Sequence, residues 1–364
     1  MGTLDRRDLL KAALAVPAML VGPTRTVDAE ASAYGGRLYG AAVRAEALTG
    51  DPHFARRVGA DCGWITPEID FKWNALEHRR GGWWFERADA IVAFARYERM
   101  GLRGHTLLWE QSTPDWARAE MADRGDWRLI ERWFDAVLGR YAEAAGEWDV
   151  VNEPIDTEHG EHGLRRTCFH RAFGADYVDR ALRAARERAP TARLMVNEYG
   201  LEYGSGVERD RRRALLKLVE RLRRDDVPLD GVGVQAHLDL AKGPLDTAAI
   251  ANMFHEIADM GLSISITELD VKEADRTLSI GMRDHAIDDE VRRYLDVALA
   301  QPAVRGVVSW GVSDRDSWLQ EGIEAPTPAS LNRGLPLDAA MRPKRVYWTL
   351  REVTRRERGD PHQT

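Results

Sequence analysis

Short apolar runs alternate along this chain with longer segments in which apolar residues recur at helical spacing. The run 148–154 shows the pattern most clearly, because an apolar Val150-Val151 pair leads directly into Asn152, Glu153 and Pro154. Proline cannot continue a strand ladder, so we expect a buried strand that ends with a carboxylate at its tip. The other strand-like runs are 38–43, 62–68, 102–109, 193–199, 232–238, 263–271 and 304–310.

Amphipathic segments lie between these runs. In the segment 86–100, for example, apolar residues fall near helical spacing and Gly101 follows as a helix stop. The segments with helical patterns are 51–58, 86–100, 126–145, 169–189, 208–224, 247–260, 286–300 and 344–355.

This alternation of strands and helices predicts the fold class. Strand and helix pairs without a Ser/Gly-rich linker indicate an α/β protein built as a single (β/α)8 barrel, which we place at residues 34–356. A doubly wound open sheet is the alternative. A nucleotide-binding sheet of that kind needs a glycine-rich turn after its first strand, and Gly40-Ala41-Ala42 lacks that pattern.

Composition narrows the possible partners. A chain of 364 residues with 44% hydrophobic content can bury the core of one large barrel or of two ordinary domains. The net charge of −7 argues against a nucleic-acid partner, since proteins that bind nucleic acid are usually basic. The 12 tryptophans offer flat apolar faces for ligand rings, although they could equally be core residues.

The N-terminus has the order of features that export signals show. Charged residues that include Arg6-Arg7 precede an apolar run from Ala12 to Gly22 and then a small-residue stretch. We therefore expect residues 1–33 to be a signal peptide for the twin-arginine export machinery, and the protein to be periplasmic or secreted. No other run is apolar enough for a membrane anchor, and residues 357–364 form a polar tail.

Cysteines and histidines give little indication of a metal site. Cys62 and Cys168 are expected to be free, buried thiols, with a single disulfide as the alternative in an exported protein. His159 and His162 stand in a glycine-containing stretch that would not align them on a helix, so we expect a loop and no metal.

The predicted barrel would bring two glutamates to one end. Glu153 and Glu268 both follow apolar strand residues, and in such barrels the carboxyl ends of the strands face the same side. Glycoside hydrolysis requires one carboxylic acid and one carboxylate across a sugar ring, and two strand-tip glutamates suit that chemistry.

Five motifs also resemble glycoside hydrolase family 10, the endo-1,4-β-xylanases, in order from about Leu38 to Leu350. The motifs are Gly104-His105-Thr106-Leu107-Leu108-Trp109, Trp148 to Pro154, Asp230 to His237, Ile266-Thr267-Glu268-Leu269-Asp270, and Trp310-Gly311-Val312-Ser313-Asp314. The resemblance implies a retaining enzyme without a cofactor, which cuts internal β-1,4 bonds of xylan. Glu153 would be its acid/base and Glu268 its nucleophile.

The resemblance also implies roles for residues around the two glutamates. His237 and Asp270 would orient Glu268, and Asn152 would bond a sugar hydroxyl near the reacting carbon. The residues expected to bind substrate are Glu68, Lys72, His105, Trp109, Asn197, Gln235, Trp310 and Trp318.

Three departures from the family pattern concern the surroundings of the carboxylates. Ile69 replaces an asparagine after Glu68, Glu110-Gln111-Ser112 follows Trp109, and Asn197-Glu198-Tyr199-Gly200 stands where the family more often has Asn-Asp-Tyr-Asn. The first two fall on the donor side of the cleft, where losing a hydrogen-bonding group weakens discrimination between sugars. Another β-glycan, a decorated polysaccharide, or a carbohydrate-binding barrel with weak turnover therefore remain as alternatives.

Overall fold

The computed structural model describes residues 38–321, 327 and 330–355. The predicted signal peptide at 1–33 and the polar tail at 357–364 lie outside these residues. Within the described ranges, no helix combines the length and the hydrophobicity that a bilayer crossing requires.

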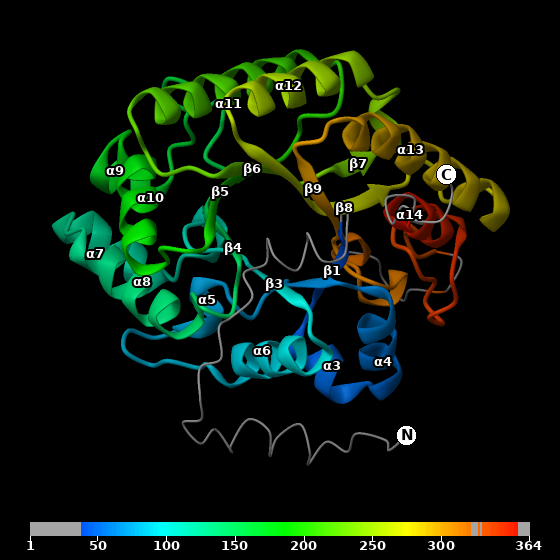
Figure 1. The fold of residues 1–364 in the computed structure, drawn as a ribbon, viewed down its shortest axis with the longest axis horizontal. Helices are drawn as coiled ribbons and strands as arrows, with labels where there is room; N and C mark the ends of the chain where they lie inside the picture. The colour runs from blue at the N-terminus through cyan, green and yellow to red at the C-terminus, as the bar shows by residue number, and fades with distance from the viewer. Residues whose placement is uncertain (1–37, 322–326, 328–329, 356–364) are drawn as a thin grey trace, which may run out of the picture.

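A closed ring of parallel strands forms the centre of the molecule (Figure 1). Its strands pair in chain order, and the ring closes because β6 pairs with β8 and β1 pairs with β9. The described strands are β1 (Leu38–Val43), β2 (Trp64–Pro67), β3 (Gly101–Gly104), β4 (Glu147–Asn152), β5 (Arg193–Glu198), β6 (Gly231–Val234), β7 (His237–Asp239), β8 (Ser263–Lys272) and β9 (Val304–Ser309). The short β7 pairs only with β8 and lies outside the ring. The predicted (β/α)8 barrel is thereby confirmed.

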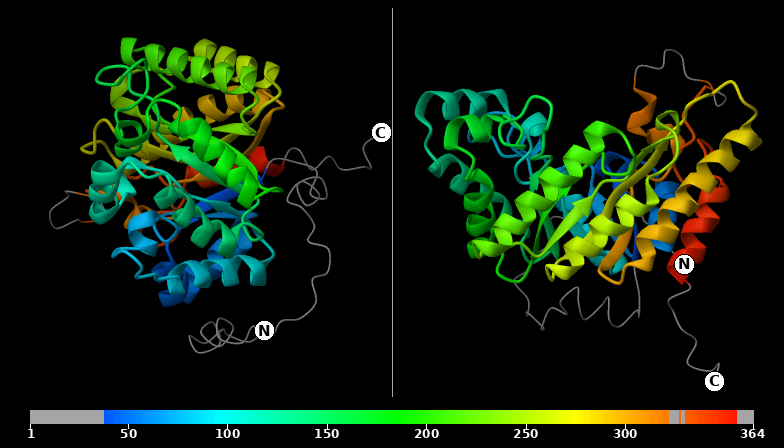
Figure 2. Two further views of the ribbon diagram at one scale, coloured as in Figure 1. Left: turned by 90° about the vertical axis from the view of Figure 1, so that its left-hand side faces the viewer. Right: turned by 90° about the horizontal axis from the view of Figure 1, so that it is seen from above.

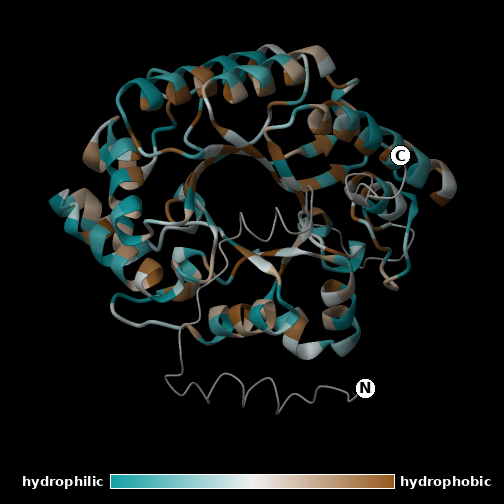
Figure 3. Ribbon diagram, in the orientation of Figure 1, coloured by the Kyte–Doolittle hydropathy of each residue, from teal (hydrophilic) through white to brown (hydrophobic). Residues whose placement is uncertain are grey.

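Helices surround the ring (Figures 1 and 2). The described helices are α3 (Ala45–Gly50), α4 (Pro52–Asp61), α5 (Trp73–Leu76), α6 (Glu86–Glu98), α7 (Asp115–Arg124), α8 (Arg128–Tyr141), α9 (Cys168–Phe173), α10 (Tyr177–Arg188), α11 (Gly206–Arg224), α12 (Thr247–Asp259), α13 (Ile280–Ala300) and α14 (Arg345–Arg355). Helices such as α11 and α12 show both hydrophobic and hydrophilic turns along their length (Figure 3). This is the pattern of helices that bury one face against strands and leave the other in water.

Side-chain caps and buried apolar faces explain where several helices begin and how they are held. Ser205 and Ser279 accept hydrogen bonds from Glu208 N and Met282 N at the starts of α11 and α13. Helix α8 buries Trp133 completely, and a large apolar side chain buried in this way contributes about 1.5–3 kcal/mol.

The third strand is shorter than the pattern 102–109 predicted, because packing inside the barrel limits it. A Cβ on Gly104 would lie 2.2 Å from the Trp148 ring, so only glycine fits there. Beyond it the chain leaves the ladder, and the peptide between His105 and Thr106 is cis. Further along, Leu108 pairs with Val151 in an isolated β-bridge.

Other predicted boundaries were also displaced. The strand predicted at 232–238 is interrupted at Ala236, whose φ is +61°, and resumes as β7. The helix predicted at 169–189 is divided into α9 and α10 after Gly174, whose φ is +83°. Helices α3, α5 and α7 were not predicted, since they are short or lack a strong apolar periodicity.

The cysteine prediction was right about pairing and partly wrong about burial. Both thiols are free. Cys168 is buried, but Cys62 is only partly buried, because it caps α4 instead of standing inside the predicted strand 62–68.

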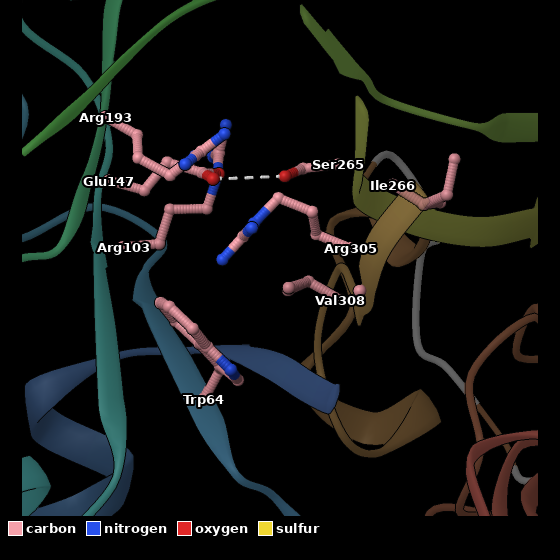
Figure 4. Close-up of a pocket in the computed structure, with 9 residues that line it drawn as sticks. Trp64, Arg103, Glu147, Arg193, Ser265, Ile266, Arg305 and Val308 are labelled. Carbon is pink, nitrogen blue, oxygen red and sulfur yellow. Dashed lines mark hydrogen bonds and ion pairs between the residues drawn. The ribbon is translucent and has the colours of Figure 1, made fainter. Parts of the chain in front are cut away.

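A small cavity lies at the end of the barrel where the strands begin (Figure 4). It is lined by Arg103, Glu147, Ser265, Arg193 and Arg305. The volume open to the centres of water molecules is about 40 Å³. Ser265 Oγ donates a hydrogen bond of 3.1 Å to Glu147 Oε2, a contact that joins β8 to β4. This end of the barrel therefore has room for only a few water molecules.

Candidate active site

Glu153 follows the last residue of β4 at the opposite end of the barrel. Its backbone is left-handed, with φ of +55°, and its N–H donates a hydrogen bond of 2.8 Å to Asn197 O. Arg165 Nε donates to Glu153 O at 2.9 Å. Backbone contacts on both sides thus fix the direction in which the 9%-exposed Glu153 side chain points.

Glu268 lies within β8 and is 4% exposed. Asn197 Nδ2 donates to its Oε1 atom at 2.7 Å, and His237 Nε2 lies 3.4 Å from its Oε2 atom. Both carboxylate oxygens therefore have a partner, which fixes the orientation of the group.

Side-chain amides connect the two glutamates. Asn197 Nδ2 also donates to Asn152 Oδ1 at 2.8 Å, and Asn152 Nδ2 reaches Glu153 Oε1 at 3.4 Å. Gln235 Nε2 donates to the same Glu153 oxygen at 3.3 Å. Three strand ends thus contribute to one continuous network between the carboxyl groups of β4 and β8.

The electrostatic environment keeps Glu268 ionised. Burial alone would raise the pKa of its carboxyl, but the hydrogen bond from His237 and the charge of neighbouring His105 outweigh burial and lower the pKa to about 2. Burial likewise lowers the pKa of His237, yet Asp270 and Glu268 outweigh it and raise that pKa well above its usual value. The pair is therefore an imidazolium next to a carboxylate at neutral pH.

Asp270 holds His237 from behind. His237 Nδ1 lies 2.8 Å from Asp270 Oδ1, and Trp318 Nε1 donates to Asp270 Oδ2 at 2.6 Å. Trp310 stands edge-on to His237 with ring centres 6.3 Å apart. The predicted grouping of Glu268 with His237 and Asp270 is present in the structure.

The remaining predicted residues line the side next to β2 and β3. Lys72 Nζ lies 4.5 Å from the Trp109 ring centre and 5.8 Å from that of Trp310. Burial lowers the pKa of the Lys72 ammonium, and Glu268 is the acidic neighbour that offsets this most. His105 is buried, with its ring 5.2 Å from Trp310.

Three neighbours of these residues were not identified from the sequence. Arg44 pairs with Glu68 through Nε at 3.0 Å and Nη2 at 2.5 Å. His105 Nδ1 lies 2.8 Å from Asp149 Oδ2, and Arg103 pairs with the same carboxylate. Asp149 and Arg103 could have been found as charges inside apolar strands, but nothing in the sequence pattern marks Arg44.

The residues that depart from the family pattern differ in their exposure and in the direction of their side chains. Ile69 is 38% exposed beside Glu68. Glu110 is directed away toward α7 and α9, where it pairs with Arg118 and accepts a 2.5 Å hydrogen bond from Cys168 N. Glu198 is buried and accepts from Ile155 N at 2.8 Å and Tyr199 N at 3.0 Å.

His159 and His162 are exposed in the loop after β4. Among the described residues, no group of three or more His, Cys, Asp or Glu side chains is placed to hold a metal ion.

Comparison with known proteins gives a consistent result. A sequence model of "Glycosyl hydrolase family 10" matches residues 26–353. The chain is 32% identical over 316 residues to "Endo-1,4-beta-xylanase 3" of Hypocrea jecorina, covering 86% of this chain and 81% of that protein. It is 31% identical over 276 residues to an endo-1,4-beta-xylanase of Agaricus bisporus, covering 74% and 78%.

Among solved structures, xylanase 10B of Thermotoga petrophila in complex with xylobiose superposes with a TM-score of 0.77. The match covers 98% of this chain and 99% of that one at 23% identity, and it shows a shared fold.

Proposed function

The chain belongs to glycosyl hydrolase family 10 and is a glycoside hydrolase, and from this premise we propose that it is an endo-1,4-β-xylanase that retains the anomeric configuration. Its relatives in Hypocrea jecorina and Agaricus bisporus carry the xylanase name, which supports xylan as substrate. The reaction would proceed by double displacement, with Glu268 and Glu153 as the two carboxyl groups.

In the first step, a Glu268 carboxylate oxygen attacks the anomeric carbon and forms a glycosyl ester. The bond from that carbon to the leaving sugar's oxygen breaks, and the Glu153 carboxyl gives its proton to that oxygen. In the second step, Glu153 takes a proton from water, whose oxygen attacks the anomeric carbon. The ester bond breaks and the Glu268 carboxylate is restored.

The placement of Glu268 is the observation that carries this proposal. Asn197 Nδ2 and His237 Nε2 lie 2.7 Å and 3.4 Å from its two carboxylate oxygens, and the amides of Asn197 and Asn152 connect it to Glu153. A carboxyl whose pKa is about 2 is fully available as a nucleophile near neutral pH. On the acid/base side, Asn152 and Gln235 both donate to Oε1 of Glu153, so the acid's proton belongs on Oε2. The two carboxyl groups thus have environments suited to different roles.

The same mechanism on another β-linked glycan is the second candidate. The apolar, 38%-exposed Ile69 favours it, because an amide that would bond a sugar hydroxyl is absent there.

Hydrolysis assays distinguish these candidates. Reducing ends released from xylan, glucuronoxylan, arabinoxylan and mixed-linkage glucan would be measured for the wild type, Glu153→Ala and Glu268→Ala. Proton NMR of the first product identifies its anomer, and retention is expected. Undiminished release by Glu268→Ala would overturn the mechanism, whereas release from glucan but from none of the xylans would overturn only the substrate.

We also propose export through the twin-arginine route. The support is the order of charged, apolar and small residues within 1–33, which lie outside the described residues. In a bacterial host, Arg6→Lys with Arg7→Lys should leave the protein inside the cell. Unchanged export of this double variant would contradict the proposal.

A further inference from the structure

A pocket opens beside the candidate active site, between the ends of β1 and β2 and the segment after β9. The pocket volume open to the centres of water molecules is about 510 Å³, and the apolar residues of its lining include Val43, Phe54 and Val312. Glu68 and Trp318 belong both to this pocket and to the candidate active site. Spaces of this size are typical of small-ligand sites, so a whole sugar unit fits.

Arg44 lines the pocket together with its partner Glu68. Its side chain is 42% exposed, whereas the side chain of its partner Glu68 is 8% exposed. A guanidinium carries five N–H donors, and the pair with Glu68 is made through Nε and Nη2. This pair uses two of the five donors, so the exposed side chain of Arg44 has further donors to offer a ligand in the pocket that it lines. The side chain of Ile69 has no donor.

Arg44 is also held in place. Its contacts with Glu68 form the two-point pair that suits a planar guanidinium and a carboxylate. A donor fixed in this way loses little conformational entropy when it binds a sugar hydroxyl.

The charges around the pocket indicate which sugars fit. Its lining includes the cations Arg44 and Arg315 and the acids Glu46, Glu68, Asp316 and Glu321. Arg315 is already paired with Asp51 and Asp316. The pocket lining thus holds four acidic and two basic side chains. Its negative charge would repel a carboxylated sugar but not a neutral sugar.

We propose that Arg44 determines specificity on the donor side of the cleft, by binding the hydroxyl groups of a neutral sugar unit in this pocket in place of the amide absent at Ile69. The acidic lining excludes a uronic acid from the same position. This inference rests on the proposed xylanase function, and the donor side is the side on which the family resemblance places Glu68 and Lys72.

Aryl glycosides of different length test the role of Arg44. We expect Arg44→Met to lower kcat/KM on an aryl β-xylobioside or xylotrioside by about 10- to 100-fold. The same variant should change kcat/KM on an aryl β-xyloside, which carries one sugar on the donor side, by less than about 2-fold. That substrate also reports whether the variant folds with an intact catalytic centre.

Arg80→Met is the matched control. Arg80 makes the same kind of two-point pair with Glu120 at an exposed position outside the pocket, with bonds of 2.6 Å and 3.0 Å. It should leave kcat/KM unchanged on every substrate. Equal losses for Arg44→Met on short and long glycosides, or no loss on either, would overturn the inference.

Product analysis tests the charge argument. Mass spectrometry of digests should find arabinose, and no uronic acid, as a branch on the xylose second from the reducing end of a product, because that xylose occupied the pocket. The double variant Glu46→Gln with Glu321→Gln should admit the uronic acid branch. Equal use of both branches by the wild type would refute the exclusion.

Failure of the proposed function gives a different pattern. A wild type that hydrolyses none of the xylosides or xylans overturns that function and this inference together. Normal xylan hydrolysis with no dependence on Arg44 overturns the inference alone.

Discussion

Asn197 donates a hydrogen bond of 2.7 Å to Oε1 of Glu268, from a strand two positions away in the ring. The same amide nitrogen reaches Asn152, so one side chain orients groups on both sides of the reacting centre. Thr267 Oγ1 in turn donates to Asn197 Oδ1 at 2.7 Å and fixes which way the amide points.

Removal of this amide should impair turnover. We expect Asn197→Ala to lower kcat on xylan by about 10²- to 10³-fold, the range seen when an oriented donor next to developing charge is lost. Reducing-end assays would measure it. Asn252→Ala, at an exposed position on α12, is the control and should retain wild-type activity.

Replacement of His237 should move the acid limb of the pH profile. The imidazolium stabilises the ionised form of Glu268, whose pKa is about 2, so His237→Asn should raise that pKa. The acid limb of the pH profile should therefore move to higher pH by about 1–2 units, so that the variant loses activity at a pH where the wild type is still active. Profiles of kcat/KM against pH measure the shift.

The matched control is His255→Asn, which removes an exposed histidine paired with Asp259. An acid limb that stays in place in His237→Asn would contradict the assigned role of the imidazolium.

Glu198 should make stability decrease with rising pH. Burial and the neighbouring Glu153 raise its pKa from 4.5 to about 8 in the folded protein. Its stabilising contribution is therefore complete below the unfolded pKa and is lost as pH rises through about 8. Urea unfolding of Glu198→Gln should show a weaker pH dependence than the wild type between these values.

Glu143→Gln, at an exposed position, should keep the pH dependence of the wild type. Glu202, whose pKa is also raised, to about 7, is present in every variant, so the difference between curves isolates Glu198.

Removal of the charge of Arg103 should strongly destabilise the fold. Arg103 pairs with Asp149 and with Glu147, whose Oε1 lies 2.8 Å from Nε, and all three are buried. Arg103→Met leaves those carboxylates without their cation, and a buried pair broken in this way costs about 3–5 kcal/mol of unfolding free energy.

Urea unfolding at pH 7 would measure the loss, with Arg80→Met as the control at an exposed pair. An Arg103→Met protein as stable as the control would show that neighbouring groups compensate for the lost charge.

The barrel and the presence of two glutamates at one of its ends could be predicted because apolar runs and helical spacing repeat along the chain. Glu153 and Glu268 directly follow such apolar runs, so the predicted barrel places both glutamates at the end where the carboxyl ends of the strands lie. Glu268, however, lies within β8 and not at its tip, because β8 extends to Lys272 and pairs there with β7. The break at Ala236 and the early end at Gly104 depend on backbone conformation and on the Trp148 ring, neither of which a local pattern records.

The partners of the site residues were harder to predict. Arg44 lies at the start of α3 with no motif around it, and its pairing with Glu68 arises only when β1 and β2 lie side by side. The direction of Glu110 away toward Arg118 likewise depends on a helix, α7, that the sequence pattern did not indicate.

The pairing of β1 with β9 has a consequence for how the chain is made. Leu38 lies opposite Gly306, so the first strand cannot complete its ladder until β9 has been synthesised. Translation proceeds at about 5–20 residues per second, so one edge of β1 stays unpaired for about a quarter of a minute to a minute before β9 is made. A chain that is terminated before Val304 would leave the edges of β1 and β8 unpaired, and open edges of this kind are templates for aggregation.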